Sequence, residues 1–442
     1  MSVGLQRLRD EPDLLRRGAA DKGEDPAVVD VAVALDGRRR TLLAESDALK
    51  AERNDASRRV GEVIRGGADP NGPDVAELKA ASRRVGDRIA HLESELETVQ
   101  AELDDAMLRI PNPPDADVPV GGEEANLVVR EVGEPLLRVD DSDPEYGPWA
   151  RRPHWEIAEA LGLIDNVRGA KVTGSGWPVY LGDGARLQRA LISWFLDVHS
   201  NEHGMTEVWP PVLVNADSAR GTGQIPDKED QMYVATRDDL YLIPTAEVPV
   251  TNLHRDEILD VDALPRRYAA YSASFRREAG AAGRDTRGIL RLHQFDKVEM
   301  VSFVRPADSE AELEWLTERA EVLLQRLGLA YRVLLMSTRE MGFVQARKYD
   351  LEVWAPGVER WLEVSSVSNF RDYQARRMAI RHRPEVGARP ELLHTLNGSG
   401  LALPRTVAAI LETYQQPDGS VAIPEVLRPY FGGRQLLESG AA

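Results

Sequence analysis

The chain has 442 residues with a formal net charge of -18; 42% are hydrophobic, 29% are charged and none is cysteine. This favours a globular protein of two domains in a reducing cytoplasm, and it excludes disulfides and cysteine-ligated zinc. The negative net charge argues against nonspecific binding of DNA or other nucleic acid by the surface as a whole. We also expect no signal peptide and no membrane partner, because no apolar run of about 18 residues occurs.

Residues from about 28 to 65 and from about 74 to 108 are predicted to form two long helices. In the first, apolar residues recur at every seventh position from Leu35 to Val63, and in the second they recur in steps of four and three from Val85 to Leu103. This heptad pattern is typical of a coiled coil. The intervening "GGADPNGP" is rich in helix breakers. We expect an antiparallel helical hairpin about 50 Å long.

The distal half of this hairpin, from Lys50 to Arg88, carries nine basic and seven acidic residues, whereas the proximal "ESELETVQAELDD" has no basic residue. Two interpretations remain open. The arginines form i,i+4 ion pairs on a solvated surface, or they bind the phosphates of a nucleic acid. The candidates for phosphate contact are Arg53, Arg58, Arg59, Arg83 and Arg84.

A Pro- and Gly-rich segment from Ile110 to Asn126 is predicted to link two domains. We place a helical domain at residues 1–112 and a second domain at 113–442, with a loose tail from about residue 433. In the second domain, alternating runs such as "RRYAAYSASF" and "YDLEVWAP" are interleaved with helical stretches such as "DSEAELEWLTERAEVLLQRLG". This pattern indicates an α+β fold with a mainly antiparallel sheet flanked by helices.

The stretch "FRREAGAAGRDTRGILRLHQFDKVEM", Phe275 to Met300, holds five arginines and one lysine against four acids. The strand period places Arg276 and Glu278 on one face before a mobile Gly-rich loop at 279–288. The residues that share one face after the loop are Arg291, His293, Phe295, Lys297 and Glu299. Guanidinium groups bind phosphates, a ring stacks on a base and a carboxylate binds an amine. The hairpin is therefore predicted to bind a nucleotide; the alternative is a solvated charged sheet face.

This stretch resembles motif 2 of class II aminoacyl-tRNA synthetases, specifically of bacterial seryl-tRNA synthetases. The resemblance covers nearly the whole chain, and it includes "TEVWPPVLVN", "YLIPTAEVPVTNLHRDEI", "LEVSSVSNFRDYQARR" and "HTLNGSGLALPRTVAAILETYQQPDGS" in the family's order. It implies motif 1 at about 187–215, motif 2 at about 267–300 and motif 3 at about 394–413. The implied reaction activates L-serine with ATP to seryl-adenylate and pyrophosphate, then transfers serine to the 3′-terminal adenosine of tRNA(Ser). Whether tRNA(Sec) is also a substrate is left open.

The resemblance implies site residues one by one. The residues expected to contact ATP are Arg276, Arg277, Glu278, Arg291, Leu292, Phe295, Glu363, Val364, Ser365, Ser366 and Arg405. Those expected to contact serine are Thr245, Ala246, Glu247, Glu299 and Ser399. Arg276, Glu278 and Arg405 are the expected catalytic residues. Arg276 would bind the α-phosphate, Phe295 would stack on adenine, and Glu363 with Ser366 would hold Mg²⁺. His293 is expected to be structural.

The resemblance also implies a symmetric homodimer built through motif 1, and a hairpin that grips the long variable arm of tRNA(Ser). Two alternatives remain. One is a duplicated homologue that loads an acceptor other than tRNA, against which the hairpin argues. The other is a non-catalytic coiled-coil or tRNA-binding paralogue, against which the joint presence of Arg276, Glu278, Glu299 and Arg405 argues.

Two features depart from a simple pattern. Strict alternation would pair Glu363 with Ser365 rather than Ser366, so the strand must end or bulge between them. The chain also differs from many relatives at Arg339-Glu340, Val344-Gln345, Val367 and Pro404. None of these differences removes a residue that was assigned a role above.

Overall fold

The computed structural model describes residues 3–141, 143, 145, 147–279 and 287–439. The chain divides into two compact units, Met1–Pro111 and Asn112–Ala442. In the described part of the chain, no helix is long and apolar enough to cross a bilayer.

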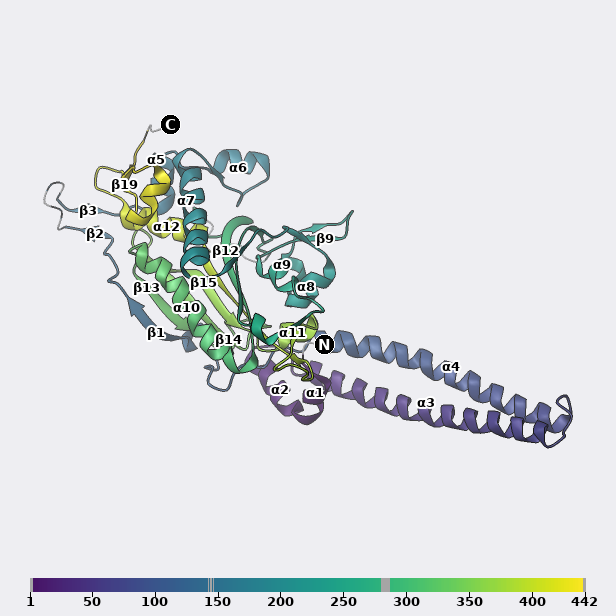
Figure 1. The fold of residues 1–442 in the computed structure, drawn as a ribbon. Coiled ribbons are helices and arrows are strands. Elements are labelled where there is room, and N and C mark those ends of the chain that lie inside the picture. Colours follow the sequence, from purple (N-terminus) through teal and green to yellow (C-terminus); the bar gives the residue numbers. More distant parts are fainter. Residues whose placement is uncertain (1–2, 142, 144, 146, 280–286, 440–442) are drawn as a thin grey trace. The chain divides into compact units, whose positions relative to one another are not determined.

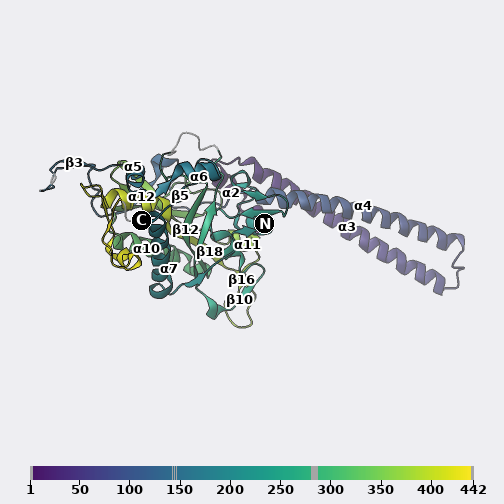
Figure 2. The ribbon, with the colours of Figure 1, turned by 90° about the horizontal axis from the view of Figure 1, so that it is seen from above.

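The first unit is helical. Its elements are α1 (Leu5–Asp10), α2 (Pro12–Asp21), α3 (Ala27–Arg65) and α4 (Pro73–Leu108). Helices α3 and α4 lie side by side (Figures 1 and 2), and Leu42, Leu92 and Val99 are buried along their seam. The predicted hairpin is confirmed. The 39 residues of α3 span about 58 Å at 1.5 Å per residue, slightly more than predicted.

The second unit is built on an eight-stranded sheet with the order β1-β13-β14-β15-β18-β12-β11-β6. Its strands are β1 (Leu127–Val132), β6 (Thr206–Val208), β11 (Arg266–Phe275), β12 (Gln294–Val304), β13 (Tyr331–Leu335), β14 (Arg347–Ala355), β15 (Arg360–Asn369) and β18 (His394–Ala402). Every neighbouring pair is antiparallel except β11 with β6. The predicted α+β fold with a mainly antiparallel sheet is confirmed.

One face of this sheet carries the main core. Val298, Met300, Leu351, Val353 and Leu362 point to this face and belong to one buried cluster. The same cluster includes apolar side chains of α7 (Asp183–Asp197), α10 (Ser309–Arg326) and α12 (Leu403–Tyr414), which are labelled in Figure 1. Because side chains alternate along a strand, the residues between these apolar ones point to the opposite face. That face carries the charged residues.

Shorter elements complete the unit. The helices are α5 (His154–Ala160), α6 (Asn166–Val172), α8 (Ala216–Thr222), α9 (Glu247–Asn252) and α11 (Tyr373–Arg377), and a π-helical turn, Val198–Glu202, extends α7. The 3₁₀ helices are Glu123–Ala125, Glu229–Gln231, Val261–Ala263, Pro306–Asp308 and Glu425–Phe431. The short strands are β2 (Val139–Asp140), β3 (Trp149–Ala150), β4 (Ile164–Asp165), β5 (Val179–Tyr180), β7 (Leu213–Val214), β8 (Val234–Ala235), β9 (Leu240–Leu242), β10 (Ile258–Leu259), β16 (Arg381–His382), β17 (Glu391–Leu392), β19 (Val421–Ala422) and β20 (Leu436–Leu437).

The C-terminal segment differs from the prediction. The prediction of a loose tail from about residue 433 is wrong for residues 433–439. Strand β20 pairs with β19, Leu437 is buried, and the Arg434 guanidinium forms two hydrogen bonds to the carboxylate of Asp183. Burial of a leucine and this bidentate ion pair hold the segment in place. Residues 440–442 lie outside the described part.

Motif 2 also differs in detail. Strand β11 ends at Phe275 and β12 begins at Gln294, so Arg276, Glu278, Arg291 and His293 lie in the connecting segment and not on the strands. Of the five residues predicted to share one face after the loop, only Phe295, Lys297 and Glu299 lie on a strand, so the strand period applies only to these three. Most of the predicted mobile Gly-rich loop, residues 280–286, lies outside the described residues.

Candidate active site

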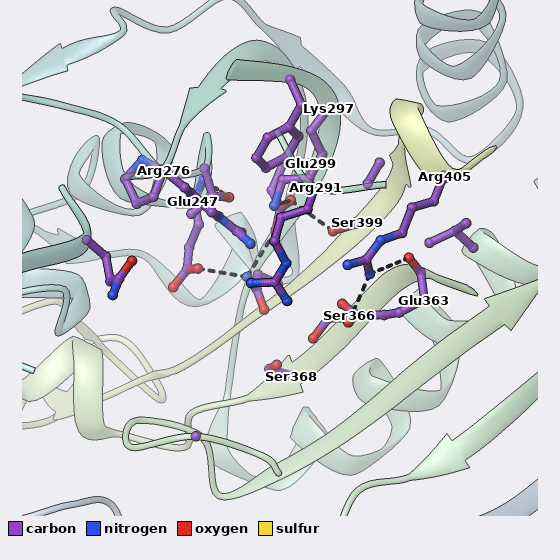
Figure 3. Close-up of a pocket in the computed structure, with 18 of the residues that line it drawn as sticks. Glu247, Arg276, Arg291, Lys297, Glu299, Glu363, Ser366, Ser368, Ser399 and Arg405 are labelled. Atoms are coloured by element: carbon purple, nitrogen blue, oxygen red, sulfur yellow. Dashed lines mark hydrogen bonds and ion pairs between the residues drawn. The ribbon is translucent and has the colours of Figure 1, made fainter. Parts of the chain in front are cut away.

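A cavity of about 490 Å³ opens on the charged face of the sheet. Strands β12, β15 and β18, the ends of the motif 2 connection and the first turn of α12 contribute its lining. In Figure 3 the guanidinium groups of Arg276, Arg291 and Arg405 point into this space from separate segments. Glu299, Glu363, Ser366 and Ser399 face the same space. The cavity therefore joins residues from all the motifs that predicted an active site.

Arg276 and Arg291 are positioned by the connection between β11 and β12. The Arg276 guanidinium carbon lies 5.1 Å from the centroid of the Phe295 ring. Arg291 Nη1 donates a hydrogen bond of 2.7 Å to Glu278 Oε2. Glu278 has a φ of +51°, in the left-handed region that non-glycine residues rarely adopt. This backbone turn brings its carboxylate back to Arg291.

Arg405 lies in the first turn of α12 and contacts two other segments. Its Nη1 donates to the backbone oxygen of Glu363 at 2.9 Å, and its Nε donates to the backbone oxygen of Leu290 at 3.2 Å. Desolvation in the cavity acts against ionisation of Glu363, but the charges of Arg405 and Lys348 outweigh it and lower the pKa of Glu363. The Glu363 carboxylate is thus available as an anionic oxygen ligand.

A β-bulge explains how Glu363 and Ser366 face the same cavity. Ser365 pairs with Leu351, but Glu363 pairs with Glu352, so Val364 is the extra residue between them. One extra residue reverses the side-chain alternation of the strand. Both Glu363 and Ser366 consequently line the cavity. The break in alternation predicted for this strand is confirmed.

A second group of polar residues lies deeper in the cavity. Asn397 Nδ2 donates to Glu247 Oε2 at 2.8 Å and to Glu299 Oε1 at 3.0 Å. Gln374 Nε2 donates to Glu247 Oε1 at 2.6 Å, and Lys297 Nζ lies 2.6 Å from Glu299 Oε2. Burial and the neighbouring charge of Glu299 raise the pKa of Glu247 to about 7. Two carboxyls and an amide thus form a site suited to an ammonium group.

Three predicted contact residues lie outside the cavity lining. Ala246 is buried in the smaller core beside α9. Arg277 Nη1 donates to the backbone oxygen of Asp230 at 2.9 Å. Ser365 Oγ donates to the backbone oxygen of Ser399 at 2.6 Å. The lining itself includes the remaining predicted residues Thr245, Glu247, Arg276, Glu278, Arg291, Leu292, Phe295, Glu299, Glu363, Val364, Ser366, Ser399 and Arg405.

Several lining residues had been assigned no role. They include Lys228, Lys297, Glu340, Gln345, Lys348, Ser368 and Asn397. Lys297 and Asn397 each lie two positions before a predicted site residue on the same strand, Glu299 and Ser399. Because residues two apart on a strand share a face, the sequence could have predicted that Lys297 and Asn397 line the cavity. The chain brings Lys228, Glu340 and Gln345 to the cavity from loops, which carry no such period. His293 stacks on Trp177 with the ring centroids 5.7 Å apart, which fits its predicted structural role.

Of the five hairpin arginines predicted to contact phosphates, Arg53 is half-buried and the other four fall into two groups. Arg58 and Arg59 both form ion pairs with Asp55, as expected of a solvated helical surface. Arg83 and Arg84 are exposed, and within the described chain neither is found in an ion pair. The hairpin therefore has arginines in ion pairs on a solvated surface and arginines that are available to bind phosphates.

The antiparallel sheet and its arginine-lined cavity have the arrangement of a class II aminoacyl-tRNA synthetase. The family model described as tRNA synthetase class II core domain (G, H, P, S and T) matches residues 233–414, and the model described as Seryl-tRNA synthetase N-terminal domain matches residues 4–114. The chain is 54% identical over 436 residues to a serine–tRNA ligase of Thermomicrobium roseum, covering 98% of this chain and 94% of the relative. It is 49% identical over 437 residues to a serine–tRNA ligase of Exiguobacterium sibiricum, covering 99% of this chain and 100% of the relative.

Two solved structures resemble the whole chain. The seryl-tRNA synthetase from Pyrococcus horikoshii complexed with ATP matches with a TM-score of 0.91 at 37% identity, over 99% of each chain. The cytoplasmic serine–tRNA ligase from Naegleria fowleri in complex with AMP matches with a TM-score of 0.88 at 29% identity, again over 99% of each chain. The chain belongs to the seryl-tRNA synthetase family of ATP-dependent aminoacyl-tRNA ligases.

Proposed function

We propose that this cavity carries out serine–tRNA ligation in two steps, with ATP on the side of Arg276, Arg291 and Arg405 and serine beside Glu247 and Glu299. The single observation that carries this proposal is that three guanidinium groups and a buried pair of carboxyls line one cavity. Phosphates favour the first group and an amino-acid ammonium favours the second.

In the first step, a serine carboxylate oxygen attacks the α-phosphorus of ATP. A new P–O bond forms, the bond to the bridging oxygen breaks, and pyrophosphate leaves with that electron pair. No general base is needed, because an α-carboxyl with a pKa of about 3.5 is already ionised. The protein therefore contributes positioning and charge stabilisation. Arg276 binds the α-phosphate beside Phe295, which stacks on adenine, while Arg291 and Arg405 bind the terminal phosphates.

Serine is bound by the deeper group. Its ammonium lies between Glu247 and Glu299, with Thr245 nearby, and its hydroxyl meets Ser399 and Glu299. A site that hydrogen-bonds a hydroxyl rejects an analogue without it by about 10⁴ to 10⁵, because its buried polar groups would lose their partner. We expect alanine to be rejected in this way.

Glu363 and Ser366 are the residues proposed to hold Mg²⁺. They fit this ion because it prefers oxygen ligands and usually takes only one or two carboxylates from the protein, with phosphates and water in its other positions. Both residues line the cavity, and the pKa of Glu363 is lowered, so its carboxylate is ionised. When bound, Mg²⁺ neutralises phosphate charge.

In the second step, a hydroxyl of the terminal adenosine of tRNA(Ser) takes the seryl group and AMP leaves. We propose that the hairpin binds the long variable arm of this tRNA, a role supported by the exposed Arg83 and Arg84. We place the enzyme in the cytoplasm, where serine, ATP and tRNA occur together.

We also propose a symmetric homodimer formed through α7 and the strands that follow it. Trp209 is 77% exposed, and its ring centroid lies 5.3 Å from that of Tyr271. Leu213, in β7, is also exposed. Trp209 and Leu213 lie in the same short segment after α7, and large apolar side chains left exposed in this way are typical of an interface between subunits.

The test of this function is serine-dependent exchange of pyrophosphate into ATP, followed by charging of tRNA(Ser). Exchange and charging are both expected. Exchange without charging of any tRNA would favour the duplicated homologue that loads another acceptor. Binding of tRNA without exchange would favour the non-catalytic paralogue.

A further inference from the structure

The loop that carries Lys228 is tied to the motif 2 segment that follows Arg276. The backbone nitrogen of Gln231 donates to the backbone oxygen of Lys228 at 3.0 Å, which closes a short turn. The backbone oxygen of Gln231 accepts from the nitrogen of Arg277 at 2.9 Å. The Gln231 side chain also exchanges hydrogen bonds with the backbone of Ala279, at 3.0 and 3.2 Å. These bonds fix the loop beside the arginine assigned to the α-phosphate.

The Lys228 side chain lines the active-site cavity without an ion-pair partner. It is one of three lysines in the described lining. Lys297 Nζ lies 2.6 Å from Glu299 Oε2, and Lys348 Nζ lies 3.0 Å from Asp350 Oδ2. Within the described chain, Lys228 forms no such ion pair. The cavity therefore holds one ammonium group whose counter-ion the described residues do not supply.

The surroundings of this ammonium favour the entry of an anion. Solvent in the cavity reaches the Lys228 side chain, but partial desolvation by the cavity walls is the largest effect on its pKa and lowers it. The neighbouring carboxylate of Asp227 acts in the opposite direction. The positive charges of Arg276 and Lys348 lower the pKa further, and the carboxyl of Glu247 raises it. A negatively charged substrate group would supply the missing opposite charge and stabilise the ammonium.

We propose that the Lys228 ammonium binds the carboxylate of the serine substrate, an inference that rests on the proposed function. The serine ammonium lies between Glu247 and Glu299, and the serine carboxylate must reach the α-phosphate bound by Arg276. The carboxylate therefore lies between Glu247 and Arg276. Lys228 lines the same cavity as these two residues, and its loop is bonded to the residue that follows Arg276.

An ammonium group at this position assists adenylate formation in two ways. It binds the carboxylate oxygen that does not attack, and so it orients the attacking oxygen toward the α-phosphorus. It also offsets the repulsion between the carboxylate and the triphosphate. The bound oxygen carries less negative charge once the new P–O bond has formed. Lys228 therefore contributes more to the binding of serine than to the chemical step, and its loss should act mainly on the KM for serine.

The test measures serine-dependent pyrophosphate exchange in the parent chain, Lys228→Met and Lys228→Arg. Methionine is an unbranched side chain that lacks the charge. We expect Lys228→Met to raise the KM for serine about 10- to 100-fold, as for the loss of a hydrogen bond between charged groups. The KM for ATP should be unchanged. Lys228→Arg keeps a cation and should retain most of the affinity for serine.

A substrate analogue separates a contact with the carboxylate from a general effect on the loop. L-Serinamide has the ammonium and hydroxyl groups of serine, but an uncharged amide replaces the carboxylate. Its inhibition constant against serine should change far less in Lys228→Met than the KM for serine does. Glu229→Gln is the matched control, because it removes a charge from the next residue, which is exposed and lies outside the described cavity lining. It should leave both constants unchanged.

The outcomes decide the proposal. A higher KM for serine in Lys228→Met, with the KM for ATP and the inhibition by serinamide unchanged, supports it. An unchanged KM for serine would overturn it. An equal loss of serine and serinamide binding would mean that Lys228 only supports the loop, and a higher KM for ATP alone would assign the ammonium to a phosphate; both results overturn the proposal. A parent chain without serine-dependent exchange would instead refute the proposed function, and this inference with it.

Discussion

Glu247 and Glu299 share one hydrogen-bond donor: Asn397 Nδ2 lies 2.8 Å from Glu247 Oε2 and 3.0 Å from Glu299 Oε1. Both carboxyls are buried. Glu299 has Lys297 Nζ at 2.6 Å, whereas the Glu247 carboxyl accepts hydrogen bonds from the side-chain amides of Gln374 and Asn397. Burial and the charge of Glu299 therefore raise the pKa of Glu247 to about 7, so this carboxyl is protonated in about half of the molecules at pH 7 when serine is absent.

This arrangement predicts a pH dependence of serine binding. As the pH falls through about 7, Glu247 gains a proton and attracts the serine ammonium less, so the KM for serine should rise. Glu247→Gln should have a high KM for serine at every pH and lose this dependence. Pyrophosphate exchange at saturating ATP, measured across this pH range, tests both. Parallel pH profiles for the parent and the variant would contradict the role of Glu247.

The same pKa predicts a pH dependence of stability with a definite sign. The ordinary glutamate pKa is 4.5 and that of folded Glu247 is about 7, so between these values the folded chain binds more protons than the unfolded chain. The contribution of Glu247 to the free energy of unfolding therefore falls as pH rises through this window. Glu247→Gln should be more stable than the parent above pH 7 and closest to it near pH 4.5. Urea unfolding at several pH values measures the difference.

Arg276 is expected to stabilise charge that develops on the α-phosphate. Arg276→Ala should lower serine-dependent exchange by about 10²- to 10³-fold, or about 3–4 kcal/mol of transition-state stabilisation, while the fold is retained. The neighbouring Arg277 is the matched control, because its guanidinium bonds to the backbone of Asp230 outside the cavity lining. Arg277→Ala should have a much smaller effect. Near-normal exchange in folded Arg276→Ala would remove Arg276 from the mechanism.

Regular periods in the sequence predicted the scaffold well. The heptads predicted α3 and α4, and the strand period predicted that Lys297 and Glu299 share a face. The bulge at Val364 was also predictable, because Glu363 and Ser366 cannot share a face on a regular strand. The strand period failed for Arg276 and Arg291, since β11 ends at Phe275 and β12 begins only at Gln294.

Contacts between distant segments were not predictable in this way. His154 and Glu412 are 258 residues apart and meet only because α5 and α12 pack together. Lys228, Glu340 and Gln345 reach the active-site cavity from loops. Their positions depend on the packing of the whole unit, and no local period carries that information.

The dimer prediction concerns the exposed surface around Trp209. One chain has a mass of 49.0 kDa, so a homodimer has twice that mass. Light scattering at micromolar concentration should give the dimer value, and Trp209→Lys should shift the protein toward the monomer because it places a charge in an apolar interface. Leu137→Lys is a control at another exposed apolar residue, 76% exposed. A parent chain of about 49 kDa in solution would contradict the dimer.

The last prediction separates the hairpin from the active site. Replacing residues 30–108 with a short linker should leave serine-dependent exchange close to normal, because no residue of that range lines the active-site cavity. Charging of tRNA should collapse, since the variable arm would lose its binding surface. Aminoacylation with purified tRNA(Ser) at several salt concentrations measures the effect.

Two double variants then show which arginines of the hairpin contact RNA. Arg83→Ala with Arg84→Ala should raise the KM for tRNA and reduce its salt dependence, because these exposed side chains are available to phosphates. Arg58→Ala with Arg59→Ala should have a milder effect, because both guanidinium groups already pair with Asp55. Equal effects would mean that those pairs open on binding. If the shortened chain charged tRNA as well as the full chain, the hairpin would be structural and the interpretation of its arginines wrong.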